Sequence, residues 1–300
     1  MSRFKTGTLL VLLSGVCFGF VPVLGLYAYQ GGATVLTLLF LRFTFAACIF
    51  FTYLFARSIK LRLTRAIVFP LLLIGGLFHP LQSYLYLASL KYISAGLAVL
   101  LFYTYPVWVA IWSFLFHKER LSVQTACAIA LAFAGLSLVV GTSLDTVNSI
   151  GVILALGSAF FISIYIISSG KILQQMDSIV VSAFLTLLNS VFFFVVGSAT
   201  GTLNFHLEPL GWLATIASAI IATNIALFAF LAGLERVGST TASILCMTEP
   251  VTTAIFSALL LSQRLTLLQW FGGLVILLGA ALVVVAKGKH KEGQVTSPAP

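Results

Sequence analysis

An internal repeat is the feature that most constrains this chain. When the sequence is shifted by 144 residues, its second half aligns with its first without a gap: Gly7 with Gly151, Leu41 with Leu185, Pro106 with Pro250, and Gly135 with Gly279. The best-matched stretch pairs residues 87–140, containing LLFYTYPVWVAIWSFLFHKERL, with residues 231–284, containing ILCMTEPVTTAIFSALLLSQRL. The fold is therefore expected to consist of two equivalent halves.

Composition places these halves in a membrane. Hydrophobic residues make up 60% of the chain and charged residues only 8%, and the mean hydropathy is +1.14. A soluble domain has about 25% charged residues, so a water-facing surface is excluded. The net charge of +9 comes from basic residues in short loops. These loops form no basic face that could follow phosphates, and no nucleic-acid partner is expected. The four cysteines lack metal-ligand spacing, so neither a metal nor a cofactor is expected.

Ten segments have the roughly 20 apolar residues that a membrane-spanning helix needs. The expected spans are Thr6–Tyr29, Ala33–Phe55, Ala66–Leu90, Gly96–Phe116, Ser122–Gly141, Ile150–Gly170, Ile179–Ala199, Leu210–Gly233, Ser239–Leu261 and Leu267–Ala286. Residues 1–143 and 144–286 then form two five-helix repeats, and residues 287–300 form a basic tail expected to be disordered. An odd number of spans makes the second copy enter the membrane from the opposite side. The predicted fold is an all-α integral membrane protein with inverted-topology repeats.

Lysine and arginine predict the orientation. With the N-terminus in the cytoplasm, the inside segments hold Arg3, Lys5, Arg57, Lys60, Arg62, Arg65, Lys118, Arg120, Lys171, Arg236, Lys287, Lys289 and Lys291. The outside loops hold only Lys91 and Arg264. Both termini are therefore predicted to be cytoplasmic.

Four polar side chains are predicted to lie near the middle of the membrane. Arg42 and Glu249 are the charged residues well inside a span, and His79 and Asn224 are at a similar depth. Because charges in the hydrocarbon layer cost about 2.5–3.5 kcal/mol on insertion scales, they usually face the bundle interior. A shared central cavity is the expected arrangement.

Prolines occur in the same layer. Pro80 follows His79, and Tyr105-Pro106 and Glu249-Pro250 are repeat equivalents, while Pro22 interrupts the first span. Proline removes a backbone N–H and frees a carbonyl one turn earlier. Matched interruptions in two repeats point to the binding site of a transporter.

The candidate substrate-binding residues are His79, Gln82, Tyr86, Tyr103, Tyr105, Asn224, Glu249 and Phe18. His79, Gln82 and Tyr86 share one helix face, whereas Tyr103 and Tyr105 lie on nearly opposite faces of a regular helix, so that only one is expected to face a cavity. Glu249 either contacts substrate or a proton, or joins two helices as a protonated structural group. Arg42 is a candidate for coupling or for a charge pair with Glu249, or else a purely structural partner of Glu249 or of freed carbonyls, and His79 is either a site residue or a packing residue. Small residues such as Gly15, Gly19, Ala130, Ala134 and Gly279 are expected at helix contacts inside the monomer or, alternatively, in a homodimer.

Several motifs resemble the EamA-type carriers of the drug/metabolite transporter superfamily. They are Leu41-Arg42-Phe43, YISAGLAVLLFYTYP at residues 92–106, Lys118-Glu119-Arg120-Leu121-Ser122, Thr248-Glu249-Pro250 and Arg264-Leu265-Thr266. The resemblance implies ten helices in inverted repeats around a central cavity, and export of amino acids or other small metabolites. Ser262-Gln263-Arg264 departs from the family's usual Gly-Glu-Arg, and Cys17-Phe18-Gly19 departs from the usual tryptophan before the glycine.

The leading functional hypothesis is a secondary carrier in the bacterial inner membrane that exports a small polar or amphipathic compound, with possible proton coupling. The alternatives are an integral-membrane lipid-processing enzyme and a channel. The sequence lacks HExxH, GxSxG and paired aspartates, so an enzyme is not expected. It also lacks a P-loop, so ATP hydrolysis by this chain is not expected.

Overall fold

The computed structural model describes residues 3–59, 65–89, 92–93, 98, 101–117, 122–140, 148–260 and 267–295. Every regular element in these residues is helical, which confirms the predicted all-α class. The elements are α1 (Arg3–Phe18), α2 (Val21–Gln30), α3 (Val35–Ala56), α4 (Arg65–Leu73), η1 (Ile74–Phe78), α5 (His79–Ser89), α7 (Tyr105–His117), α8 (Val123–Val140), α9 (Ser149–Ile172), α10 (Ser178–Ala199), α11 (Pro209–Ala219), η2 (Ile220–Ile225), α12 (Ala226–Val237), α13 (Ser239–Leu245), η3 (Cys246–Thr248), α14 (Glu249–Leu260) and α15 (Leu267–Val295).

Six helical stretches in the described residues are long and apolar enough to cross a membrane. They are Arg3–Gln30, Val35–Ala56, Ile67–Tyr86, Ser149–Ile172, Ser178–Ala199 and Pro209–Val237. Three shorter apolar helices are Tyr105–Phe116, Val123–Leu138 and Trp270–Leu282. Large apolar side chains such as Phe55, Ile153 and Leu213 are mostly exposed on the outside of the bundle, as expected for a surface that contacts lipid.

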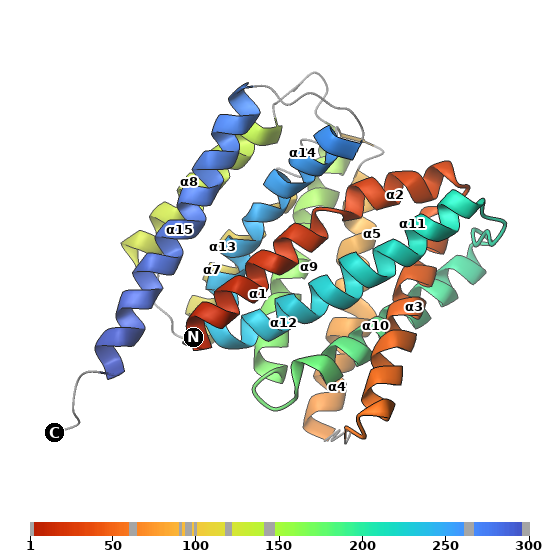
Figure 1. Ribbon diagram of the computed structural model, residues 1–300, viewed down its shortest axis with the longest axis horizontal. Coiled ribbons are helices and arrows are strands. Elements are labelled where there is room, and N and C mark those ends of the chain that lie inside the picture. Colours follow the sequence, from red (N-terminus) through yellow and green to blue (C-terminus); the bar gives the residue numbers. More distant parts are fainter. Residues whose placement is uncertain are drawn as a thin grey trace.

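The repeat-equivalent helices α3 and α10 pack side by side and run antiparallel (Figure 1). Thr34, before α3, hydrogen-bonds to Thr202, after α10. Further along, the Thr44 and Ser190 hydroxyls are 2.6 Å apart, and Phe51, near the end of α3, packs on Phe184, near the start of α10. Two copies of one sequence segment therefore face each other in opposite directions.

The same antiparallel relation holds for α8 and α15, which lie together at one side of the bundle (Figure 1). The Cα of Gly135 approaches Ile276, and the Cα of its equivalent Gly279 approaches Ala132, which is the equivalent of Ile276. A Cβ on Gly135 would lie 2.7 Å from the Ile276 nitrogen, and one on Gly279 would lie 3.1 Å from the Ala132 nitrogen. Glycine at both positions allows the two backbones to approach closely.

A second pair of equivalent contacts extends the symmetry to α1 and α9. Gly7 of α1 packs against Arg236 and Val237 at the end of α12. Gly151 of α9 packs against Tyr92 and Ile93, whose positions are the repeat equivalents of Arg236 and Val237. The two halves are therefore related by an approximate two-fold axis.

The helix ends form two opposite faces of the bundle. At one face, Arg3 binds Glu235 with an N–O distance of 3.0 Å, joining the start of α1 to the end of α12. Gly238, at the turn between α12 and α13, has φ +85°, a conformation that glycine adopts without strain. At the other face, the Glu208 N–H donates to the Gly31 carbonyl at 3.0 Å.

Two regions differ from what the sequence predicts. Helix α15 continues to Val295, into the stretch expected to be a disordered tail, because no proline interrupts the helix before Pro298. Ala130 and Ala134 are exposed on α8 rather than packed inside the monomer. The buried face of α8 instead contains Ala128, Ala132 and Gly135, which contact α15.

Candidate functional site

The prolines of the fourth and ninth predicted spans interrupt their helices in the same way. Helix α7 begins at Tyr105, immediately before Pro106, and α14 begins at Glu249, immediately before Pro250. In each case the preceding threonine hydroxyl donates to a carbonyl three residues earlier, from Thr104 to Leu101 O at 2.6 Å and from Thr248 to Leu245 O at 2.9 Å. Because proline donates no hydrogen bond, the backbone turns at both sites.

The first span is also interrupted, as Gly19 and Pro22 predict. Helix α1 ends at Phe18, a turn occupies Gly19 and Phe20, and α2 begins at Val21. Its repeat equivalent, α9, is continuous from Ser149 to Ile172. This interruption therefore belongs to the first half only.

Helix α1 packs directly against the break in the ninth span. A Cβ on Gly15 would lie 2.6 Å from the Thr248 hydroxyl, and one on Gly19 would overlap the Thr252 hydroxyl. The Thr252 hydroxyl lies 3.2 Å from the Gly15 carbonyl and 2.8 Å from the Glu249 carbonyl. The glycines of α1 thus position the backbone beside Glu249.

The third and eighth spans each contain a π-helical turn at overlapping repeat positions. Turn η1 covers residues 74–78, which correspond to residues 218–222, and η2 starts at Ile220. In each turn a polar side chain from the neighbouring equivalent helix binds a carbonyl. Asn189 of α10 donates to Gly75 O at 3.1 Å, and Arg42 of α3 donates to Ala222 O at 2.8 Å. π-turns frequently occur at functional sites.

Arg42 is therefore hydrogen-bonded to the eighth span. Its Nε donates to the Thr223 hydroxyl at 2.6 Å, in addition to the bond from Nη2 to Ala222 O. In the same turn, the side-chain amide of Asn224 donates a hydrogen bond to Ala46 O of α3 at 3.1 Å. Arg42 and Glu249 interact electrostatically, but their N–O distance exceeds the 4.0 Å of an ion pair. Of the roles that the sequence leaves open for Arg42, the geometry shows the bond to a carbonyl.

His79 lies in a small cluster with Asn189, Tyr165 and Phe43. Its Nδ1 lies 2.8 Å from the Asn189 Oδ1, and because an amide oxygen only accepts, the histidine nitrogen donates. The imidazole packs against the rings of Tyr165, at 4.8 Å, and Phe43, at 5.8 Å. Asn189 binds η1 with its amide group, so His79 is fixed to α10.

Glu249 lies among aromatic side chains. It is half-buried at the start of α14, and it interacts electrostatically with Tyr86, Tyr103 and Tyr105. Phe102 joins these rings, with centroids 5.1 Å from Tyr86 and 5.4 Å from both Tyr103 and Tyr105. We call Tyr86, Phe102, Tyr103 and Tyr105 the aromatic cluster.

Tyr103 and Tyr105 are both buried, and their centroids are 5.7 Å apart. The two rings therefore lie close together and not on opposite faces of a regular helix, while the prediction that at most one of them faces a cavity stays a prediction. The turn at Tyr103 and Thr104 replaces that geometry. The Tyr105 hydroxyl donates to Ser243 O at 3.3 Å. The Tyr103 hydroxyl is buried without a hydrogen-bond partner.

Gln82 and Phe18 make other contacts. Gln82 is buried against α9, where the Ser158 hydroxyl donates to its backbone carbonyl at 2.9 Å. The three residues of the predicted shared face therefore have different partners. His79 contacts Asn189 of α10, Gln82 contacts Ser158 of α9, and Tyr86 contacts Phe102. Phe18 ends α1 and packs, half-buried, against the main core.

Sequence reasoning missed Asn189, which binds both His79 and η1. Asn189 is a lone amide in an otherwise apolar span, the same signal that identified Asn224. Its partners, the Gly75 carbonyl and the His79 ring, lie on another helix, so the sequence does not reveal the contact.

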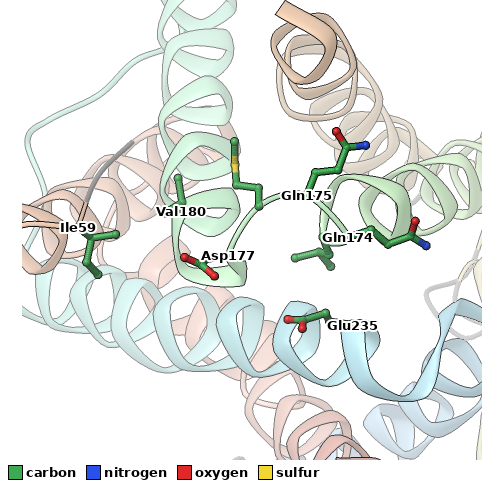
Figure 2. A pocket seen from close by; sticks show the side chains of 8 residues that line it. Ile59, Gln174, Gln175, Asp177, Val180 and Glu235 are labelled. Carbon is green, nitrogen blue, oxygen red and sulfur yellow. The ribbon is translucent and has the colours of Figure 1, made fainter. Parts of the chain in front are cut away.

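A pocket of about 540 Å³ opens at the end of the bundle, at the turn between α9 and α10. Figure 2 shows the carboxylates of Asp177 and Glu235 in the space between this turn and α12. The residues that line the pocket are Ile59, Leu173, Gln174, Gln175, Met176, Asp177, Val180 and Glu235. None of these is a candidate residue of the polar layer.

Comparison with known proteins decides the family. The EamA-like transporter family matches residues 5–141 and again residues 149–285. The chain belongs to the EamA-like transporter family. It is a multi-pass membrane transporter for small molecules, and the resemblance noted in the sequence is confirmed. The two matched stretches coincide with the two halves of the repeat.

Two uncharacterized transporters are similar to almost the whole chain. The uncharacterized transporter YcbK of Bacillus subtilis (strain 168) is 26% identical over 278 residues, which are 89% of this chain and 88% of the relative. The uncharacterized inner membrane transporter YicL of Salmonella typhimurium is 25% identical over 291 residues, 94% of this chain and 96% of the relative. A solved crystal structure has the same fold, with a TM-score of 0.81, 20% identity, and coverage of 94% of this chain and 98% of that one.

Two EamA-like motifs lie outside the described residues, and the motif at residues 92–106 lies partly outside them, at residues 94–97 and 99–100. The first two are the stretch Lys118-Glu119-Arg120-Leu121, which precedes Ser122, and the stretch Ser262-Gln263-Arg264-Leu265-Thr266. The helices that flank them, α7, α8, α14 and α15, are described. The candidate residues of the polar layer all belong to described helices or turns.

Proposed function

We propose that this EamA-like transporter is a secondary carrier that exports a small polar or amphipathic metabolite, such as an amino acid, by alternating access. The observation that carries the proposal is the pair of matched proline breaks, at Pro106 and Pro250, in two halves whose equivalent helices run antiparallel. In secondary carriers, substrates and coupling ions bind where interrupted helices of inverted repeats meet near the middle of the membrane.

The proposed topology has ten membrane crossings and both termini in the cytoplasm. The described basic residues of the helix ends, including Arg3, Arg57, Lys171 and Arg236, lie toward the face that holds the Arg3–Glu235 ion pair. The positive-inside rule assigns such a face to the cytoplasm. The name of the relative YicL supports a bacterial inner membrane as the location.

Alternating access requires the two faces of the bundle to open in turn. The ion pair between Arg3 and Glu235 joins α1 to α12 at the proposed cytoplasmic face. The breaks at Gly19, Pro106 and Pro250 give the first, fourth and ninth spans points at which one end can move relative to the other. Glu249 lies at one of these points, so movement there changes its access to either face.

We propose the half-buried carboxyl group of Glu249 as the contact for substrate or for a coupled proton. A carboxyl group inside a membrane span is costly unless it has a function or a partner, and no described cation lies within 4.0 Å of it. Facilitated diffusion or exchange is the alternative mode of transport if Glu249 carries no proton.

The test is transport by the purified protein in proteoliposomes. We expect radiolabelled amino acids to cross faster than in empty vesicles, and a proton gradient to increase the rate. Glu249→Gln should abolish the gradient-driven component across pH, because the amide cannot exchange a proton. Glu208→Gln, an exposed position at the start of α11, serves as the control.

Absence of transport above empty vesicles for every amino acid and small metabolite tried, with or without a gradient, would contradict the carrier. Unaltered gradient-driven transport by Glu249→Gln would exclude Glu249 as the coupling residue.

A further inference from the structure

The charges around Glu249 are not balanced by a direct partner. Among the described residues, the cationic group that interacts with Glu249 is Arg42, and this guanidinium is bound to Thr223 and Ala222 of the eighth span. Glu249 occupies the first turn of α14, where the partial positive charge of the helix end offsets only about half of a full negative charge. The carboxylate therefore retains the capacity to bind a cation.

The walls beside Glu249 are suited to the same kind of ligand. In the contacting pairs of the aromatic cluster, the ring centroids are 5.1–5.7 Å apart. Aromatic faces attract organic cations through the ring quadrupole and also bury apolar surface. The Tyr103 hydroxyl lies beside the Glu249 carboxyl and interacts with it, but it makes no hydrogen bond of standard geometry to any protein group.

A buried hydroxyl without a partner is costly to the folded protein. The Tyr103 side chain is 4% exposed, so water at the protein surface does not satisfy it. A ligand that places an N–H group between Tyr103 and Glu249 would satisfy both the hydroxyl oxygen and the carboxylate, which accept hydrogen bonds.

We propose that the site recognises a protonated amine attached to an apolar or aromatic body, with the ammonium group between Glu249 and Tyr103 and the body against Tyr86, Phe102 and Tyr105. This inference rests on the proposed function, since it names the substrate class of the same site. An anionic ligand is disfavoured at this position because its charge would lie next to the Glu249 carboxylate, while Arg42 directs two of its five N–H donors to the eighth span. A neutral ligand leaves the carboxylate without a counter-charge.

Binding to the full chain in neutral detergent micelles tests the assignment with three probes of matched size. Phenethylamine carries the ammonium group, 2-phenylethanol is neutral, and 3-phenylpropionate is an anion. By isothermal titration at pH 7, we expect the Kd of phenethylamine to be at least about tenfold lower than that of either other probe. Glu249→Gln should remove this preference, and Glu208→Gln should retain it.

Tyr103→Phe separates recognition from folding. Because the hydroxyl has no partner in the folded protein, its removal should leave the thermal unfolding midpoint unchanged or raise it, while it weakens phenethylamine binding about threefold or more. A hydroxyl with a structural role would instead lower the midpoint. Tyr103→Phe decides the outcome even if Glu249→Gln does not fold.

The assignment is overturned if the alcohol or the anion binds as tightly as the amine, or if Tyr103→Phe binds phenethylamine with unchanged affinity. Proteoliposome transport keeps this outcome distinct from the carrier proposal. Amine binding without transport of any solute would overturn the carrier and leave the recognition intact. Transport of another solute without an amine preference would overturn the proposed recognition of amines and leave the carrier proposal intact.

Discussion

At the scale of single residues, the two intramembrane charges have different environments. Arg42 makes two hydrogen bonds to the eighth span, whereas Glu249 has an aromatic neighbourhood and no ion pair with a described residue. Their depth in the membrane is readable from the sequence. Their partners are not, because the Ala222 carbonyl is a backbone group on a distant segment.

Arg42→Leu should destabilise the protein, because the Ala222 carbonyl in η2 and the Thr223 hydroxyl lose their donor. We expect a loss of about 1–3 kcal/mol, measured as a lower midpoint of thermal unfolding in detergent. Arg57→Leu, at the exposed end of α3, is the matched control and should change the midpoint little. Equal midpoints for the two variants would argue against a structural role of Arg42.

Asn189 shows a second limit of residue-level prediction. An amide in an apolar span signals a buried hydrogen bond, so the sequence predicts that Asn189 makes such a bond. Its pairing with His79 depends on how α10 packs against the third span. That packing follows from the two-fold arrangement of the halves and not from local sequence.

At the scale of elements, glycines and prolines account for the predictable breaks. Gly19, Pro106 and Pro250 each mark a helix interruption in the structure. The π-turn η2 has no comparable signal, since Ile220–Ile225 contains neither glycine nor proline. Turn η1 does contain Gly75 and Gly76 and precedes Pro80. The carbonyls bound by Asn189 and Arg42, which lie on other segments, are seen only in the structure.

Two glycine-to-alanine substitutions should have opposite outcomes. Gly19→Ala places a methyl group against the Thr252 hydroxyl and 3.1 Å from the Thr253 nitrogen, so α1 must shift away from α14. Gly76→Ala, in η1, adds a methyl group to open space and restricts the unfolded chain, which favours folding by up to about 1 kcal/mol.

Thermal unfolding and proteoliposome transport measure both effects. Gly19→Ala should lower the midpoint and the transport rate, whereas Gly76→Ala should raise the midpoint slightly and preserve the transport rate. If Gly19→Ala behaves like Gly76→Ala, the close contact between α1 and the ninth span is not required.

At the scale of the whole molecule, the repeat predicts the two equivalent halves, and the structure shows how they meet. Helix pairs α3–α10 and α8–α15 each join a segment to its own repeat equivalent. The gap-free 144-residue offset predicts the equivalence. The pairing of these particular helices depends on side-chain packing across the axis, for which a one-dimensional alignment holds no information.

Reporter fusions test the proposed orientation. Alkaline phosphatase, which is active only outside the cytoplasm, should be active when fused after Gly201, in the loop that follows α10. The same enzyme should be inactive after Pro300, where green fluorescent protein should fluoresce. The reverse pattern, or equal activity at both positions, would contradict cytoplasmic termini.

The interruption between α1 and α2 has no counterpart in the continuous helix α9. A carrier with two identical halves would have equal free energies when open to either side, and each state would be half populated at rest. In the proposed alternating-access cycle, the extra break in one half makes the two open states unequal in structure, so we expect them to differ in free energy. We therefore expect the unloaded carrier to rest preferentially toward one side of the membrane before any gradient acts on it.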